Sequence, residues 1–275
     1  MYDPKPTAYP YPEYTDKHYL TFKKDSGEVF DSEYPYIDNS RSFRFKRFWV
    51  RFVMRLIVFP LAAIRFGLRI RGRDYIKANK ETLKKGVVSC SNHVHMWDYI
   101  FLMKAVRPFR TNMLSWGATV TGDSGALVRL VGGIPIPETN RKAYAAFLKA
   151  VRGHVANGGW LHLYAEGSMW EYYAPIRPFK SGLGYFAVTC GKPVLPFAFS
   201  YREPGFIRKK IFRQIACVTL NVGELIYADD SLPKKERELD LVVRSHDAVC
   251  RLAGIEPEKN IYPPVFDNNR RVDYY

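Results

Sequence analysis

Apolar residues between positions 86 and 255 alternate between two periods, which predicts alternating strands and helices. Short apolar runs bounded by glycine or polar residues predict strands, at 86–90, 111–116, 134–136, 160–165, 194–201 and 215–226. Longer runs with apolar residues three and four positions apart predict helices, at 97–106, 140–156, 182–190 and 231–252. This alternation predicts an α/β domain in which helices flank a mixed central sheet.

A different pattern, in residues 41–73, precedes that domain. Four arginines recur there at helical spacing, with aromatic and aliphatic residues between them: Arg44, Arg47, Arg51 and Arg55. Pro60 breaks or kinks this helix because proline lacks an amide hydrogen, and a second apolar run follows at 61–70. The segment is therefore predicted to form amphipathic helices arranged as a hairpin.

Much of the net charge of +15 lies in the same segment, where ten basic residues and no acidic residue lie between Arg41 and Arg73. Such a patch indicates a polyanionic partner, and the patterns that read nucleic acid are missing. An arginine at mid-bilayer costs about 2.5–3.5 kcal/mol, which argues against a spanning helix. We expect an interfacial segment with its arginines toward the phosphates of anionic lipids. An ordinary helix pair with a solvated basic face is the alternative.

The two ends of the chain carry weaker patterns. Residues 1–40 hold seven tyrosines among several prolines, which favours an extended arm packed through its rings over a disordered segment. The four cysteines lack metal-ligand spacing, and with no leader pattern we expect reduced thiols in a cytosolic setting. The predicted organisation is an arm, docking helices, an α/β domain and a C-terminal tail, at 1–40, 41–73, 74–255 and 256–275.

The first candidate for chemistry lies directly after the strand at 86–90. If the chain turns sharply there, the Asp98 carboxylate can hold one nitrogen of His93 and leave the other as a base toward a hydroxyl. Taken alone this spacing is common, and a structural histidine is the plain alternative. A metal site of His93, His95 and Asp98 is a further alternative, although Trp97 and Tyr99 occupy positions where metallo-hydrolase patterns have ligands.

Two further blocks frame short apolar strands. Gly132–Glu138, followed by Arg141, alone indicates a glycine turn into an edge strand. In Pro193–Pro196 prolines bracket an apolar strand, which usually indicates an edge or terminal position.

The remaining block lies at the end of the strand at 160–165. Glu166, Gly167 and Ser168 combine a carboxylate with exposed backbone amides, a set that can hold a polar substrate. Arg177 and Lys180 follow near a predicted helix start and suit a phosphate. Each of these features alone is also a common loop.

Together, in order and spacing, the four blocks resemble the glycerophospholipid acyltransferase family, which includes the 1-acylglycerol-3-phosphate acyltransferases. That family shows NHxxxxD, a glycine-bearing block, EGT or EGS followed by FKxG, and a proline-rich apolar strand. Here they stand as Asn92-His93 with Asp98, Gly132–Pro137, Glu166–Ser168 with Phe179–Gly182, and Pro193–Pro196. The resemblance covers about residues 86–200, and the basic segment before it resembles the family's membrane-docking helices.

The resemblance implies an O-acyltransferase of phospholipid biosynthesis that works without a covalent enzyme intermediate. His93 would deprotonate the hydroxyl of a lysophospholipid acceptor, which attacks the thioester of acyl-CoA or acyl-carrier protein, while Asp98 orients His93. We expect no metal or other cofactor beyond this co-substrate. The enzyme would lie peripherally on the cytoplasmic face of a membrane.

The resemblance also places Glu166, Gly167 and Ser168 in the acceptor pocket. Two positions depart from the family. Its second block usually ends in an arginine that contacts the acceptor phosphate, where this chain has Pro137-Glu138, and its third block usually continues with an arginine, where this chain has Met169. Arg141 and Arg177, a few residues away, would take over that contact, or the acceptor is a lysophospholipid with another headgroup or another hydroxyl. Two other functions stay open: a non-catalytic basic membrane-binding protein, and a metallo-hydrolase that uses His93, His95 and Asp98.

Overall fold

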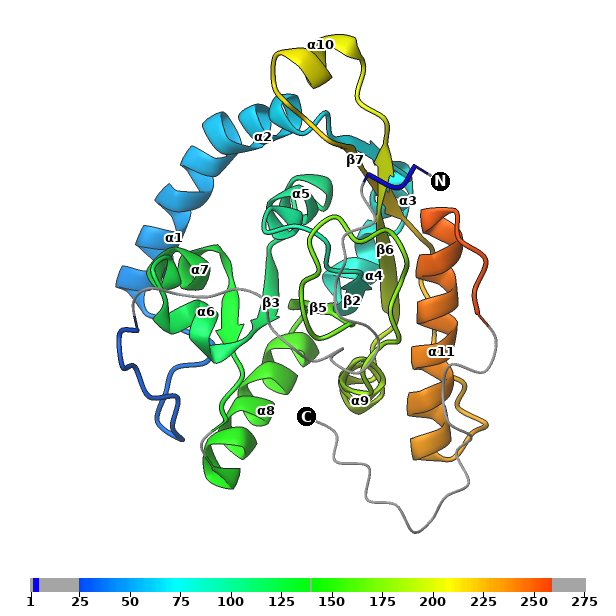
Figure 1. The fold of residues 1–275 in the computed structure, drawn as a ribbon. Helices are drawn as coiled ribbons and strands as arrows, with labels where there is room; N and C mark the ends of the chain where they lie inside the picture. The colour runs from blue at the N-terminus through cyan, green and yellow to red at the C-terminus, as the bar shows by residue number, and fades with distance from the viewer. Residues whose placement is uncertain (1, 5–24, 139, 259–275) are drawn as a thin grey trace.

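The computed structural model describes residues 2–4, 25–138 and 140–258 and shows a seven-stranded mixed sheet flanked by helices (Figure 1). This confirms the predicted fold class. The strand order is β1-β7-β6-β2-β5-β3-β4. The strands are β1 Arg69–Arg71, β2 Val87–Ser91, β3 Thr111–Ser115, β4 Gly133–Pro135, β5 Trp160–Tyr164, β6 Val194–Arg202 and β7 Cys217–Val222.

The five strands from β6 to β4 run parallel, and β7 joins β6 antiparallel. β1 pairs with β7 in parallel at the edge of the sheet. The sequence pattern predicted a helix over residues 61–70, but Arg69 and Ile70 belong to β1, so the prediction is wrong for these two residues. Because β1 belongs to the sheet, the predicted boundary at residue 73 falls after the first strand of the α/β domain.

Helices cover both faces of the sheet because successive strand residues point to opposite sides. In β2, Val87 belongs to one apolar cluster and Val88 to the other. The Val87 side packs against α3 (Arg73–Ala78), α4 (Lys80–Lys84) and α5 (Asp98–Ala105), and the Val88 side against α8 (Arg141–Ala156), α9 (Gly182–Cys190) and α11 (Lys234–Ala253). Short helices lie in two of the connections between strands: α6 (Gly117–Thr121) and α7 (Gly125–Val131) between β3 and β4, and α10 (Phe206–Lys210) between β6 and β7.

β6 lies inside the sheet, so its prolines do not mark an edge strand, but they lie at the start of β6, which is the terminal position that the sequence also allowed. Pro196 is tolerated because β7, the neighbouring strand toward which its nitrogen points, has already ended at this position. Antiparallel pairing with β7 begins only at Phe197, which faces Val222. The Pro196 carbonyl accepts from the Gly223 amide at 2.9 Å, beyond the end of β7. No donor of the sheet is lost at this position, since a strand residue directs its nitrogen and its carbonyl to the same neighbour.

The basic segment forms one bent helix, and the predicted hairpin is wrong. It comprises α1 (Arg41–Val53), a π-helical turn η1 (Met54–Val58) and α2 (Phe59–Arg65), and it curves around one side of the domain (Figure 1). Pro60 lies in the first turn of α2, where the wider π turn before it accommodates the missing amide donor. None of the described helices is long and apolar enough to cross a membrane.

Two of the four arginines that were expected to face lipid phosphates point into the protein instead. Arg47 Nη2 lies 3.3 Å from the Thr111 carbonyl and 3.2 Å from Asn112 Oδ1. Arg51 Nη2 lies 3.2 Å from the same carbonyl and 3.3 Å from that of Val131. Burial lowers the pKa of Arg51 to about 10. Arg44 and Arg55 are exposed and remain open to solvent.

Part of the aromatic arm packs on the domain. The Tyr36 ring is buried and meets Phe147 of α8 edge to face, with centroids 5.5 Å apart. Arg129 of α7 donates to the carbonyls of Pro35 and Tyr36, at 2.7 and 3.1 Å. The tyrosines between residues 5 and 24, and the tail from 259 onward, lie outside the described residues.

Candidate active site

The candidate site lies in the loops that follow β2 and β5, two adjacent parallel strands whose carboxyl ends meet at one edge of the sheet. Asn92 directly follows β2 and is fully buried. Its amide nitrogen donates to the Phe199 carbonyl at 3.0 Å, and its amide oxygen accepts from the Phe199 amide at 2.8 Å. Both ends of the side chain are used, so β6 fixes the point at which the His93 loop leaves the sheet.

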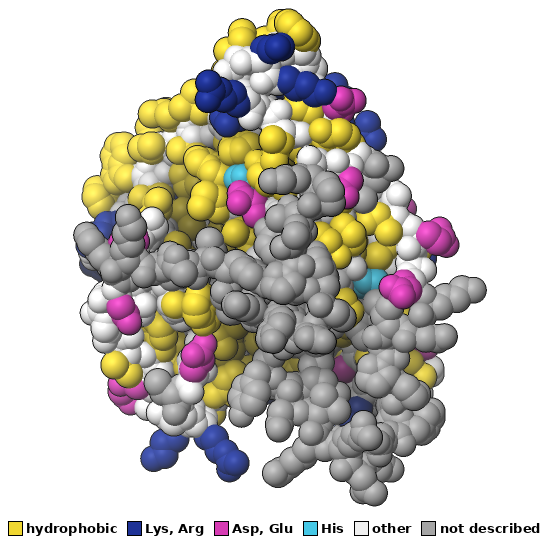
Figure 2. Space-filling view, viewed as in Figure 1, with side chains coloured by type: hydrophobic (Ala, Val, Ile, Leu, Met, Phe, Trp, Pro, Cys, Tyr) yellow, Lys and Arg dark blue, Asp and Glu magenta, His cyan; other side chains and the backbone are white. Residues whose placement is uncertain are grey.

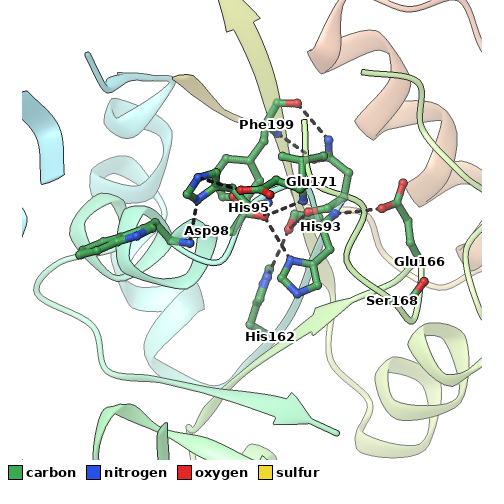
Figure 3. Close-up of polar contacts among 12 residues, drawn as sticks. His93, His95, Asp98, His162, Glu166, Ser168, Glu171 and Phe199 are labelled. Atoms are coloured by element: carbon green, nitrogen blue, oxygen red, sulfur yellow. Dashed lines mark hydrogen bonds and ion pairs between the residues drawn. The ribbon is translucent and has the colours of Figure 1, made fainter. Parts of the chain in front are cut away.

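His93 and Asp98 meet as the sequence predicted (Figure 3). His93 Nδ1 lies 3.1 Å from Asp98 Oδ2, which also accepts the amides of Val94 and His95 at 2.7 and 2.9 Å. Three donors on one oxygen hold the carboxylate at the start of α5, and Asp98 is fully buried. The His93 side chain is 20% exposed, and its Nε2 makes no hydrogen bond with any residue that the structure describes.

Glu166 holds the His93 loop from the other side. Its Oε2 accepts the His93 backbone amide at 2.9 Å, and its Oε1 accepts the Arg177 amide at 2.8 Å. The Arg177 guanidinium completes a buried ion pair, with Nη2 3.0 Å from Glu166 Oε2 and Nη1 2.8 Å from Ser168 Oγ. The same guanidinium packs over the Trp170 ring at 4.1 Å. The carboxylate of the Glu166 block thus orients His93 through its backbone.

Two backbone hydrogen bonds join the same two loops. The Trp170 amide donates to the His93 carbonyl at 3.0 Å, and the Tyr172 amide to the Val94 carbonyl at 2.9 Å. Neither loop can move without breaking several hydrogen bonds to the other. This preorganisation holds the candidate base in one geometry.

The predicted acceptor-binding residues lie in different environments. Glu166, Ser168 and Arg177 are buried against one another, so the expectation that Arg177 contacts an acceptor phosphate is replaced by a positioning role. Gly167 adopts a φ of +84°, and a Cβ there would meet the Lys180 side chain at 3.3 Å, which places Lys180 beside this turn. Arg141 is exposed at the start of α8 and bonds to none of the other described candidates.

Sequence reasoning missed a buried polar chain under His93. His162 of β5 is fully buried, with Nδ1 3.0 Å from Ser89 Oγ and Nε2 3.3 Å from Ser91 Oγ. Trp160 Nε1 donates to Ser89 Oγ at 2.7 Å, and Ser91 Oγ donates to the Asn92 carbonyl at 2.8 Å. Burial lowers the pKa of His162 to about 3, so the ring is neutral. His162 and Tyr164 are two positions apart in β5, so the alternation of a strand could have shown that both side chains lie on the same face of the sheet.

His95 points away from the pair of His93 and Asp98. Its Nδ1 accepts the Trp97 amide at 3.1 Å, and its Nε2 lies 3.5 Å from a Glu171 carboxylate oxygen. Burial lowers the pKa of His95. In the described part of the chain, no group of three or more histidine, cysteine or acidic residues is placed to hold a metal ion. The geometry therefore gives the metallo-hydrolase alternative no support.

The fold and the site define an α/β domain with a histidine, bonded to a buried aspartate, at the carboxyl edge of its sheet. A model of the acyltransferase family matches residues 67–200. The crystal structure of the 1-acyl-sn-glycerophosphate (LPA) acyltransferase PlsC from Thermotoga maritima is similar, with 14% sequence identity and a TM-score of 0.47. That similarity covers 77% of this chain and 83% of PlsC. No curated protein sequence matches the chain.

Proposed function

We propose that the protein transfers a fatty acyl group from a thioester donor, acyl-CoA or acyl-carrier protein, to a hydroxyl of a lysophospholipid. The observation that carries the proposal is the geometry of His93, whose Nδ1 is bonded to buried Asp98 while the ring stays partly exposed. A carboxylate that holds Nδ1–H fixes the tautomer in which Nε2 carries the free lone pair. Such a base suits the activation of a hydroxyl, the step that an acyltransferase domain requires.

The chemistry balances without a covalent enzyme intermediate. His93 Nε2 takes the proton of the acceptor hydroxyl as its oxygen attacks the thioester carbonyl. The tetrahedral intermediate collapses with cleavage of the carbon–sulfur bond, and the imidazolium returns its proton to the departing thiolate. Asp98 stabilises the imidazolium between these steps. No metal or cofactor takes part in this scheme.

The proposed acceptor is a lipid, which requires the enzyme to reach a membrane. The bent helix of α1, η1 and α2 presents a row of exposed apolar side chains, among them Phe45 at 66%, Leu56 at 58% and Ile64 at 62%. Figure 2 shows this apolar edge along the bent helix. We propose that it lies in the interface of an anionic leaflet on the cytoplasmic side, with Arg44 and Arg55 near lipid phosphates.

The acceptor phosphate needs a cation other than Arg177, which is committed to Glu166. Lys180, beside the Gly167 turn, and Arg141 remain the candidates that the sequence offers. The alternative is an acceptor that carries another headgroup, which the panel of lysophospholipids below distinguishes from lysophosphatidate.

The proposal is tested by transfer of labelled acyl groups from acyl-CoA, and from acyl-carrier protein, to a panel of lysophospholipids. We expect His93→Ala and Asp98→Asn to lower kcat by about 10²–10⁴. His154→Gln and Asp74→Asn serve as matched controls, since neither residue contacts the site, and both should keep wild-type rates. If the wild type transfers no acyl group to any acceptor from either donor, the result would support the non-catalytic membrane-binding alternative. Full activity of His93→Ala would show that another residue is the base.

A further inference from the structure

The connection between β6 and β7 exposes a second apolar cluster, far from α1 in the sequence. α10 and the residues after it expose five large apolar side chains within ten positions: Phe206 74%, Ile207 64%, Ile211 70%, Phe212 42% and Ile215 41%. Single exposed apolar residues are ordinary on protein surfaces, whereas a cluster of this size marks a contact site. We call these residues, together with the basic residues among them, the α10 tip.

The charge of the α10 tip indicates what covers it. Arg208, Lys209, Lys210 and Arg213 lie among the apolar residues, and the stretch 204–223 contains no Asp or Glu. Lysine is depleted in the cores of protein interfaces, whereas basic residues interleaved with Phe and Ile suit the phosphates and acyl boundary of an anionic leaflet. The charge pattern therefore favours a membrane over a protein partner.

The position of the α10 tip continues the apolar edge of the bent helix. Arg208 Nη1 donates to the Ile64 carbonyl at 2.6 Å, and Arg202 donates to the Gly67 carbonyl. The bond from Arg208 holds α10 against the end of α2, where Ile64 is 62% exposed, and the bond from Arg202 holds the end of β6 beside it. Figure 1 shows α10 beyond the end of α2, and Figure 2 shows apolar side chains from the bent helix up to this tip.

We propose that the α10 tip is a second membrane contact, which inserts its apolar side chains into an anionic leaflet and sets the tilt of the α/β domain. One helix in the interface leaves a domain free to roll about the helix axis. A second point of insertion, on a strand connection anchored in the sheet, removes that freedom. The part of this proposal that concerns the tilt depends on the proposed docking of α1 and α2. Insertion of α10 is measured independently of that docking.

The test measures binding to vesicles of phosphatidylglycerol and phosphatidylcholine in equimolar mixture, and to vesicles of phosphatidylcholine alone. We expect Phe206→Ser/Ile207→Ser/Ile211→Ser to weaken binding to the mixed vesicles by about 10-fold or more. Lys209→Gln/Lys210→Gln/Arg213→Gln should weaken it on the order of 10–100-fold, with little change on phosphatidylcholine. Arg208 is left in place because it holds α10 to α2. Val29→Ser/Tyr227→Ser replaces equally exposed apolar residues elsewhere and should bind as wild type.

If a triple variant folds poorly, the fluorescence of a dye attached to a single cysteine tests the same contact. Cys90, Cys217 and Cys250 are buried, so in a Cys190→Ser background a single new cysteine is labelled. An environment-sensitive dye at Ile211→Cys should shift to the blue on mixed vesicles, whereas one at Tyr227→Cys should not. The proposal is overturned by unchanged dye emission at Ile211→Cys, or by wild-type binding of both folded triple variants.

The outcomes also separate this proposal from docking through the bent helix. Phe45→Ser/Phe48→Ser/Phe52→Ser removes apolar residues of α1 alone. If this variant binds like wild type while the α10 variants do not, α10 insertion stands and docking through α1 fails. The reverse pattern overturns α10 insertion and leaves docking through α1 intact.

Discussion

The imidazole of His93 stacks face to face on the phenol ring of Tyr164, with centroids 3.7 Å apart and planes inclined by 10°. Tyr164 is the last residue of β5, so the sheet itself supports one face of the candidate base. Asp98 fixes the direction of Nδ1, and the stack fixes the plane of the ring. The Tyr164 hydroxyl is buried with no hydrogen-bond partner among the described residues, and burial raises its pKa well above the usual value.

The ring of Tyr164 should therefore matter to activity more than its hydroxyl does. We expect Tyr164→Phe to keep kcat within about 3-fold of wild type and to be neutral or slightly stabilising, since a buried unpaired hydroxyl costs about 1–3 kcal/mol. Tyr164→Leu should lower kcat by at least 10-fold through a mobile His93 ring, a loss within the range assigned to a general base. Steady-state kinetics and thermal melts of both variants check this. Equal losses in the two variants would assign the role to the hydroxyl instead.

Arg177 should contribute to stability through its ion pair with Glu166. Arg177→Met leaves the Glu166 carboxylate buried with backbone donors alone, and removal of one partner of a buried pair costs about 3–5 kcal/mol. Arg177→Lys should cost less, because one charge-assisted hydrogen bond can re-form, although the forked contact with Ser168 is lost. Denaturant unfolding measures both costs. If Arg177→Met unfolds like wild type but raises KM for the acceptor, the guanidinium binds substrate and the positioning role is wrong.

His162 should make the protein less stable as the pH falls. Its folded pKa of about 3 lies below the usual 6.5, so between these values the unfolded chain binds a proton that the folded chain does not. Stability is complete above pH 6.5 and is lost as the pH falls toward 3, at about 1.4 kcal/mol per pH unit for this one group. From pH 7 to 5 the loss is about 2 kcal/mol.

The contribution of His162 is isolated by comparison with His162→Asn. Urea unfolding at pH 7 and pH 5 should show a loss about 2 kcal/mol smaller in the variant, whatever its stability at pH 7. His154, whose pKa burial lowers to about 4, should contribute a similar loss over this range, because its folded pKa also lies below pH 5. An identical pH dependence in wild type and His162→Asn would mean that the folded protein accepts the proton.

Elements with a clear period were predictable from the sequence. Strands β2 and β5 and the helix after Asn140 came from apolar runs and periodicity, and the meeting of His93 with Asp98 from a turn at a strand end. β1 was not predictable, because an alternation of only three residues is too short to indicate a strand. It is a strand because β7 pairs with it, and that pairing joins residues about 150 positions apart in the chain.

The hydrogen-bond and ion-pair partners of the buried charged residues could not be predicted from the periodicity of the sequence either. Arg177 contacts Glu166 because the loop between them folds back over the Trp170 ring, and no spacing rule contains that path. Arg47 follows the same helical spacing as Arg44, yet one points inward and the other outward. Which arginines of this helix are buried depends on the backbone carbonyls that accept their hydrogen bonds, and the helix sequence alone does not contain that information.

The arginines of the bent helix should therefore separate into two pairs with different effects. Arg47 and Arg51 donate to buried carbonyls, so replacement of both with Gln should lower stability by about 2 kcal/mol or more and disturb the packing of α1. Arg44 and Arg55 are exposed, so the same replacement should leave the melting temperature unchanged. Each exposed arginine near an anionic leaflet contributes about 1 kcal/mol, so Arg44→Gln/Arg55→Gln should bind mixed vesicles on the order of 10-fold more weakly. Melts and vesicle binding of both pairs, at low and high salt, measure the difference. Wild-type vesicle binding of Arg44→Gln/Arg55→Gln at low salt would show that this pair does not face the lipid phosphates.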